Sequence, residues 1–201
     1  MKMPSHIATA RYVGRWHRLR ISLLGVLLLW LSCSAAGLPQ AAAVPSPLVA
    51  RRAEAVTRVV LGIISYTQWP SSLAQLQLCV LADPVYAGDL LNHAPTSGGM
   101  KIAVRRMDID DPHLGRDCNA VYLGAVTQAQ RVEIFGRLSG HPVLSISDAN
   151  ATCAAGSMFC LYVEDTDRVR FKTNLDSVAR SGVRVDPHVL LLSQPGRVSK
   201  P

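Results

Sequence analysis

The chain has 201 residues, and its 21 lysine and arginine residues outnumber its 14 aspartate and glutamate residues. Much of this excess lies at the N-terminus, because five of the basic residues and none of the acidic ones fall within residues 1–43. Residues 44–201 therefore carry a net charge near +2, from 16 basic and 14 acidic side chains. A charge this small does not favour nucleic-acid binding, and the remaining length suits one domain with its own core.

Residues 1–43 have the features of an export signal. The basic residues precede an apolar run from Ile21 to Leu31 that contains six leucines. The run is about half as long as the roughly 20 residues that a membrane-spanning helix needs, and small residues follow it up to Ala43. We therefore predict a signal peptide over residues 1–43, cleaved after Ala43, and a periplasmic domain over residues 44–201. A retained N-terminal membrane anchor is the alternative that the same order of charges allows.

The domain is predicted to begin with a helix and then to alternate between strands and helices. Apolar residues recur with helical spacing over 47–69 and stop before Pro70, and residues 75–82 form an apolar run typical of a buried strand. A short helix is predicted over 86–93, and strands are predicted over 101–107 and 119–124. Thr127 and Gln130 fit a capping box, which predicts the start of the next helix.

The last third of the chain predicts a hairpin and two further helices. Residues 142–147 are strand-like, and residues 158–164 and 169–173 are predicted to form adjacent antiparallel strands. Asn174 can cap a helix that ends at Gly182, and Asp186–Pro187 opens a short helix that continues through Leu192. Together the elements predict a single-domain α/β fold in which helices flank a mixed β-sheet.

Four cysteines remain after removal of the signal, and they are Cys79, Cys118, Cys153 and Cys160. An even number in an exported chain indicates disulfides that stabilise the fold, although the sequence alone allows three pairings. Cys153 and Cys160 are the favoured pair, because the bend between them contains Gly156 and can return the chain to bonding distance. Cys79 lies in an apolar strand pattern, so Cys79 and Cys118 are left as either bonded or free. The spacing of the cysteines does not fit structural zinc.

The common catalytic motifs are missing from the sequence. It has no Gly-x-Ser-x-Gly, no glycine-rich phosphate loop, no His-Glu-x-x-His and no Cys-x-x-Cys. We therefore expect no enzymatic activity, no cofactor and no metal. The acidic cluster over 108–111 is interpreted as a solvated turn, and three histidines are interpreted as surface residues: His113, His141 and His188.

Two other groups of polar residues are candidates for binding sites. Ser145 and Ser147 lie at the end of a predicted strand and face the same way, so they indicate either a ligand pocket or ordinary strand packing. Arg168, Arg170 and Lys172 alternate along another strand. We interpret them as a solvated face of the sheet rather than a nucleic-acid site.

Several segments, in their order along the chain, resemble the YfiR family. They are Gly62–Pro70, Leu78–Val80, Cys118–Gly124, Gly156–Cys160, Arg170–Phe171, Asn174–Asp176 and Ser181–Val185. The resemblance extends from about residue 55 to about residue 192, which is nearly the whole domain after the signal. Each segment alone is a weak match, but the ordered set is specific.

The resemblance implies a periplasmic repressor of an inner-membrane diguanylate cyclase, YfiN, and hence lower cyclic-di-GMP and less biofilm. It also implies an outer-membrane lipoprotein, YfiB, that sequesters the repressor, and a homodimer. Redox-sensitive cysteines are implied as well, paired as Cys79 with Cys118 and Cys153 with Cys160. We expect Cys153–Cys160 to be the structural bond that keeps the binding surface formed, and Cys79–Cys118 to be the more variable one.

Two other classes of protein are alternatives to this interpretation. A periplasmic small-molecule-binding protein would have a polar pocket near Ser145 and Ser147. A thiol oxidoreductase would need an exposed thiol of low pKa, whereas these cysteines lie in apolar strand contexts or in a widely spaced pair. The small-molecule-binding protein is therefore the alternative that we retain.

Overall fold

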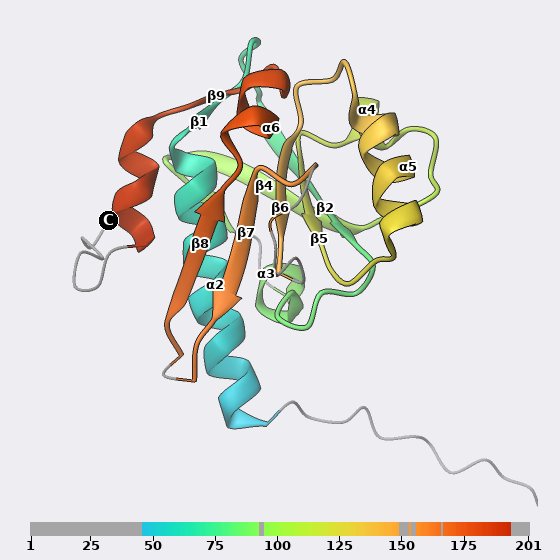
Figure 1. Ribbon diagram of the computed structural model, residues 1–201. Coiled ribbons are helices and arrows are strands. Elements are labelled where there is room, and N and C mark those ends of the chain that lie inside the picture. The colour runs from blue at the N-terminus through green and yellow to red at the C-terminus, as the bar shows by residue number, and fades with distance from the viewer. Residues whose placement is uncertain (1–45, 93–94, 149–152, 154–155, 166, 194–201) are drawn as a thin grey trace, which may run out of the picture. The chain divides into compact units, whose positions relative to one another are not determined.

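The computed structural model describes residues 46–92, 95–148, 153, 156–165 and 167–193. The predicted signal peptide lies outside the described residues. The strands are β1 (Thr67–Gln68), β2 (Gln75–Leu81), β3 (Thr96–Ser97), β4 (Met100–Arg106), β5 (Ala120–Leu123), β6 (Leu144–Ser147), β7 (Phe159–Val163), β8 (Val169–Thr173) and β9 (Arg184–Val185) (Figure 1). The helices are α2 (Pro47–Ser65), α3 (Gly88–Asn92), α4 (Leu114–Asp117), α5 (Gln128–Leu138), α6 (Leu175–Arg180) and the 3₁₀ helix η1 (Pro187–Ser193).

The main sheet has seven strands in the order β3-β4-β2-β5-β6-β7-β8. The five inner strands run parallel, whereas β3 and β8 pair antiparallel at the two edges. The strand order reverses between β2 and β5, because the chain passes from β2 outward to β4 and then returns to the other side of β2. Such a switch point is a common ligand site in α/β sheets. The predicted α/β class with a mixed sheet flanked by helices is confirmed.

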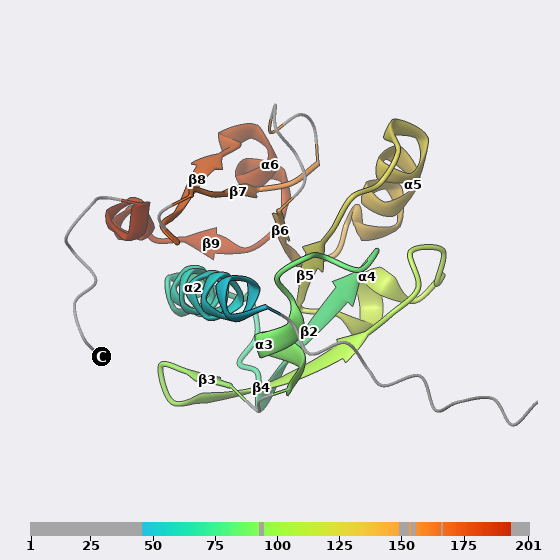
Figure 2. The ribbon, with the colours of Figure 1, turned by 90° about the horizontal axis from the view of Figure 1, so that it is seen from below.

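Each face of the sheet has its own core. Figure 2 shows α2 inside the curve of the sheet, with α4 and α5 on the opposite face. Because successive side chains of a strand point to opposite faces, Leu78 and Tyr122 pack toward α2, whereas Cys79 and Val121 pack toward α4 and α5. The second face carries Cys79 and Cys118 and the serines of β6, so it is the face on which candidate site residues gather.

Helix α2 is the first helix that the periodicity predicts, but it is shorter than expected. The Ser46 side chain accepts a hydrogen bond from the Val49 amide, and Pro47 stands in the first turn, where its missing N–H is harmless. The helix ends at Ser65 rather than near Trp69, because residues 67–68 form β1 and pair antiparallel with β9. Helical periodicity cannot register a pairing with residues so distant in sequence.

Local capping patterns were the most accurate predictors of element boundaries. In the capping box of α5, Gln130 N donates to Thr127 Oγ1 at 3.2 Å and Thr127 N donates to Gln130 Oε1 at 2.9 Å. Asn174 caps α6 as predicted, with Oδ1 accepting from the Ser177 amide at 3.0 Å. The β7–β8 hairpin is also confirmed. Four short elements were not predicted: β1, β3, β9 and α4.

Among the described residues, none of the helices is both long enough and apolar enough to cross a membrane.

Candidate functional site

The Cys153–Cys160 disulfide closes a short loop at the beginning of β7. The two Sγ atoms lie 2.06 Å apart, with Cys160 fully buried in the strand and Cys153 half-buried in the loop. Two contacts tie Cys153 to the following elements. Its Sγ lies 3.7 Å from the carbonyl oxygen of Lys172, and its own carbonyl accepts a hydrogen bond from Asn174 Nδ2 at 3.4 Å. The disulfide therefore links the loop to β7, β8 and the start of α6.

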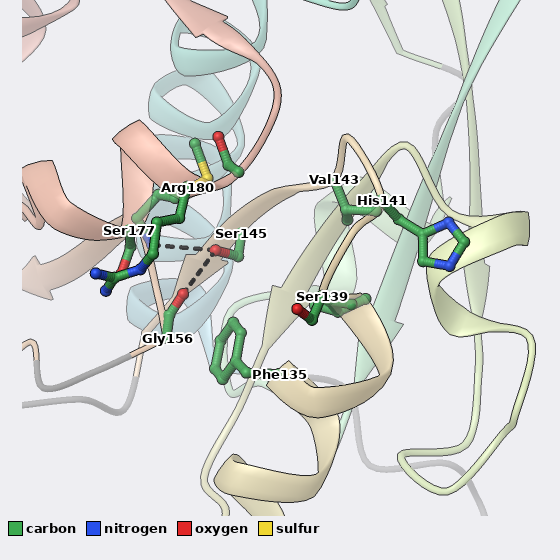
Figure 3. Close-up of a pocket in the computed structure, with 11 residues that line it drawn as sticks. Phe135, Ser139, His141, Val143, Ser145, Gly156, Ser177 and Arg180 are labelled. Carbon is green, nitrogen blue, oxygen red and sulfur yellow. Dashed lines mark hydrogen bonds between the residues drawn. The ribbon is translucent and has the colours of Figure 1, made fainter.

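Gly156 brings this loop into close contact with α5. Its φ of +116° lies in the region that favours glycine, and an added Cβ would lie 2.1 Å from Cδ2 of Phe135. Its carbonyl accepts a hydrogen bond from Ser145 Oγ at 3.2 Å, and the same Oγ accepts from the Met158 amide at 3.0 Å (Figure 3). Ser145 thus holds both ends of the segment that leads from the loop into β7.

Replacing Gly156 by alanine is expected to lower the free energy of unfolding by about 2 kcal/mol, because it adds backbone strain and a collision with the Phe135 ring. Gly140→Ala is the matched control, since Gly140 also has a positive φ of +78° but has open space around its Cα. Urea unfolding of both variants measures the difference. Equal losses would mean that the contact with Phe135 contributes nothing.

A cavity of about 270 Å³ lies beside the loop, between α5 and α6 (Figure 3). Phe135, Ser145 and Arg180 contribute to its walls. Of the two serines singled out from the sequence, Ser145 lines this cavity, with its hydroxyl already hydrogen-bonded within the protein. Ser147 does not line it and is fully buried. The structure therefore separates the two serines, for which the sequence left a shared ligand pocket and ordinary strand packing both open.

The Cys79–Cys118 disulfide lies inside the second core. Its Sγ atoms are 2.00 Å apart, and the exposed fractions of Cys79 and Cys118 are 0% and 2%. Val121 and Ile134 pack in the same cluster, and Met107 Sδ lies 3.5 Å from Cys118 Sγ. The bond joins Cys79 of β2 to Cys118, which lies between α4 and β5. It therefore cross-links β2 to the connection that leads into β5, the strand on the other side of the switch point.

Burial separates the two disulfides by their access to reductants. Thiol–disulfide exchange requires an attacking thiolate to reach a sulfur atom, which the half-buried Cys153 permits and the buried Cys79–Cys118 pair does not. In the folded protein a reductant is therefore expected to open Cys153–Cys160 first. We still expect Cys79–Cys118 to be the more variable bond, but only while the chain folds, before the core closes over its two sulfur atoms.

The crevice at the switch point is filled by the protein itself. A Cβ on Gly124 would lie 2.4 Å from the Ala82 carbonyl oxygen and 2.8 Å from the Pro84 nitrogen, so the two loops touch backbone to backbone. Ala82 and Asp83 both have positive φ, of 56° and 44°, although neither is glycine. The close packing holds these strained residues in place.

The buried Tyr122 and the half-buried Asp148 form a polar pair at this end of the sheet, which sequence reasoning missed. The Tyr122 hydroxyl donates to Asp148 Oδ2 at 3.0 Å, and the backbone amides of Val85 and Tyr86 also hydrogen-bond the carboxylate. Burial raises the pKa of Asp148, and burial together with the Asp148 charge raises the pKa of Tyr122. The position of Asp148 directly after a predicted strand was the one available clue.

Replacing Asp148 by asparagine is expected to remove a pH-dependent contribution to stability. Burial raises the folded-state pKa above the unfolded value, so the folded state binds the proton more tightly and gains stability as the pH falls through the raised pKa. Above that pKa the charged Asp148 carboxylate lowers the free energy of unfolding, because the carboxylate is partly removed from water. The variant should therefore be more stable, relative to wild type, at about pH 7 than at about pH 4. Urea unfolding across this range, with the exposed Asp110→Asn as control, tests the expectation; a pH-independent difference contradicts it.

The remaining candidates from the sequence lie on the surface. His113, His141 and His188 are exposed, and the described residues contain no group of three or more potential metal ligands. Three basic side chains are exposed in β8 and directly before it, as predicted: Arg168, Arg170 and Lys172. Glu164 pairs with the first two at 3.6 and 2.8 Å. One carboxylate, directly after β7, therefore pairs with two of these three basic groups.

The fold and its site define a class: an α/β domain with a flavodoxin-like order of parallel strands, two disulfides, and a switch point closed by contact between the backbones of its own loops. Residues 53–194 match the YfiR/HmsC-like family, and the chain belongs to that family. The resemblance found in the sequence is confirmed. The family is one of periplasmic regulators of diguanylate cyclase signalling, and membership provides no support for an enzymatic role.

Proposed function

We propose that the chain represses a YfiN-like inner-membrane diguanylate cyclase by binding the cyclase's periplasmic region. Repression lowers cyclic-di-GMP and biofilm formation, and a YfiB-like outer-membrane lipoprotein relieves it by sequestering the chain. The observation that carries the proposal is the family match over residues 53–194, which includes every described strand and both disulfides. The working unit in this proposal is a homodimer.

A repressor of this kind acts by differential binding. It shifts a cyclase toward the inactive state only to the extent that it binds that state more tightly than the active one. The amount of folded repressor sets the fraction of cyclase that is occupied, so a change of a few kcal/mol in repressor stability changes cyclase output. Disulfides can therefore act on signalling without touching the cyclase.

The test of the proposal is cyclic-di-GMP in a native host that lacks the gene. We expect deletion to raise cyclic-di-GMP and biofilm, and complementation by the full chain to restore both. Complementation by a variant without residues 1–43 is the matched control, because it keeps the domain but removes the proposed export signal. Restoration by this variant, or no rise on deletion, would argue against periplasmic repression. Crosslinking followed by mass spectrometry of membrane partners would identify the cyclase.

Export with cleavage after Ala43 is part of the same proposal. The intact mass of protein from the periplasm of the native host should correspond to residues 44–201, with two disulfides. A mass that includes residues 1–43 would instead support a retained N-terminal anchor.

Small-molecule binding is a second candidate function, and the cavity that Ser145 lines favours it. A thermal-shift screen of small polar and aromatic compounds tests this candidate. Binding at the cavity should weaken in Arg180→Ala, since the exposed Arg180 contributes to one wall. A compound that stabilises both proteins equally would bind elsewhere.

A further inference from the structure

The cavity beside the Cys153–Cys160 loop is lined by residues from the two helices next to it. Phe135 of α5 and Arg180 of α6 lie on opposite sides, and Ser145 of β6 lies between them (Figure 3). Its volume of about 270 Å³ is slightly below the roughly 300–1,000 Å³ of pockets that take drug-sized ligands. The cavity therefore suits a compact molecule, such as a single ring or a short chain with one polar group.

One side of the cavity is apolar. Its apolar wall residues are Phe135, Leu138, Val143 and Met158. Three of them are buried in the fold, whereas the Phe135 side chain is only half-buried. The ring of Phe135 lies against the Gly156 backbone, and within the described chain it stacks on no other aromatic side chain. An apolar group of a ligand would cover the remaining surface of this ring, and the burial of that surface would favour binding.

The other side of the cavity is basic. None of the described wall residues is acidic, and Arg180 is the one among them with a permanent charge. Arg180 Nη1 lies 3.7 Å from Asp176 Oδ2, but the two side chains are 70% and 84% exposed, so this ion pair is weak. A guanidinium offers two parallel N–H donors that match the two oxygen atoms of a carboxylate. Arg180 can therefore pair with a ligand carboxylate at the cavity.

We propose that this cavity binds a small monocarboxylate with an apolar body. The body lies against Phe135 and its apolar neighbours, and the carboxylate pairs with the Arg180 guanidinium. A cationic ligand would meet Arg180 and no described acidic wall residue, and an uncharged ligand would leave the guanidinium unused. The proposal rests on small-molecule binding, the second candidate function, and does not depend on repression of a cyclase.

Isothermal titration of the exported protein tests the choice of ligand. The probes are two carboxylates, phenylacetate and hexanoate, each compared with its uncharged alcohol, phenethyl alcohol or hexanol. We expect saturable binding of at least one carboxylate, about fivefold tighter than binding of the matching alcohol, because an exposed ion pair contributes at most a factor of about five. Arg180→Gln should remove this difference by weakening the carboxylate about fivefold while leaving the affinity for the alcohol unchanged.

Arg116→Gln is the matched control for Arg180→Gln. The Arg116 side chain is similarly exposed, at 67%, and pairs with Asp117 at 3.1 Å, but it does not line the cavity. Amide NMR locates the ligand, and the carboxylate should shift the amide signals of Ser139, Gly156 and Ser177.

Three results would overturn the proposal: no saturable binding of either carboxylate, equal losses in Arg180→Gln and Arg116→Gln, or shifted amides confined to another part of the protein. Equal affinities for a carboxylate and its alcohol at this cavity would also overturn the choice of a carboxylate. That last result would leave small-molecule binding standing as a function of the cavity.

Discussion

Replacing both Cys79 and Cys118 by alanine is expected to lower the free energy of unfolding by about 4 kcal/mol. The two cysteines are 39 residues apart in sequence, so their bond removes many conformations from the unfolded chain. The native contacts that depend on the sulfur atoms are few by comparison, since the pair lies among aliphatic side chains that can remain packed. A small domain has roughly 5 to 15 kcal/mol of stability in total, so the loss is a large fraction of it.

Urea unfolding of the double variant measures this loss, and the denaturant slope provides a second readout. An unfolded chain without the cross-link is more expanded, so the slope should increase together with the fall in stability. Mass spectrometry after thiol alkylation under denaturing conditions establishes whether wild type has the bond in the first place. If the bond is fully formed and the variant is equally stable, the loop-closure explanation is wrong. If part of the wild-type protein has free Cys79 and Cys118, the expected variability arises during folding.

The sequence was informative about the fold wherever a short local pattern determines structure. Thr127, Gln130 and Asn174 predicted two helix starts because a cap is a contact between residues three positions apart. The predicted strand over 169–173 has the observed bounds of β8, since one of its faces is buried and the other carries charge. By contrast, β1 exists only because Thr67 meets Val185, a partner more than a hundred residues away.

The candidate site was less predictable, because it depends on the tertiary fold. Ser145 and Ser147 share a strand face, but only the first lies beside the cavity. The role of Asp148 depends on the fold, which brings its carboxylate to the Tyr122 hydroxyl and to the backbone amides of Val85 and Tyr86. Arg131 reads in sequence as an ordinary exposed helix residue, and its burial became evident only when α5 was placed on the sheet.

Replacing both Cys153 and Cys160 by alanine is expected to lower the free energy of unfolding by about 2.5 kcal/mol and to raise cyclic-di-GMP in the native host. The stability loss is smaller than for Cys79 and Cys118 because the two residues are only seven positions apart. The effect on the cyclase has a separate cause. Without the bond, residue 153 keeps only the weak hydrogen bond from Asn174 to its carbonyl and loses its covalent attachment to β7, while Ser145 still holds Gly156 and Met158.

Two measurements separate loss of protein from loss of the binding surface. The abundance of the variant in the periplasm reports stability, and cyclic-di-GMP per molecule of folded repressor reports binding to the cyclase. Because Cys79→Ala/Cys118→Ala destabilises more but leaves this loop attached, it is the matched control. If the proposal is correct, the Cys153 and Cys160 variant derepresses the cyclase more strongly at equal abundance. If cyclase output follows abundance alone in both variants, the short disulfide acts only as a general stabiliser and has no specific role in forming the docking surface.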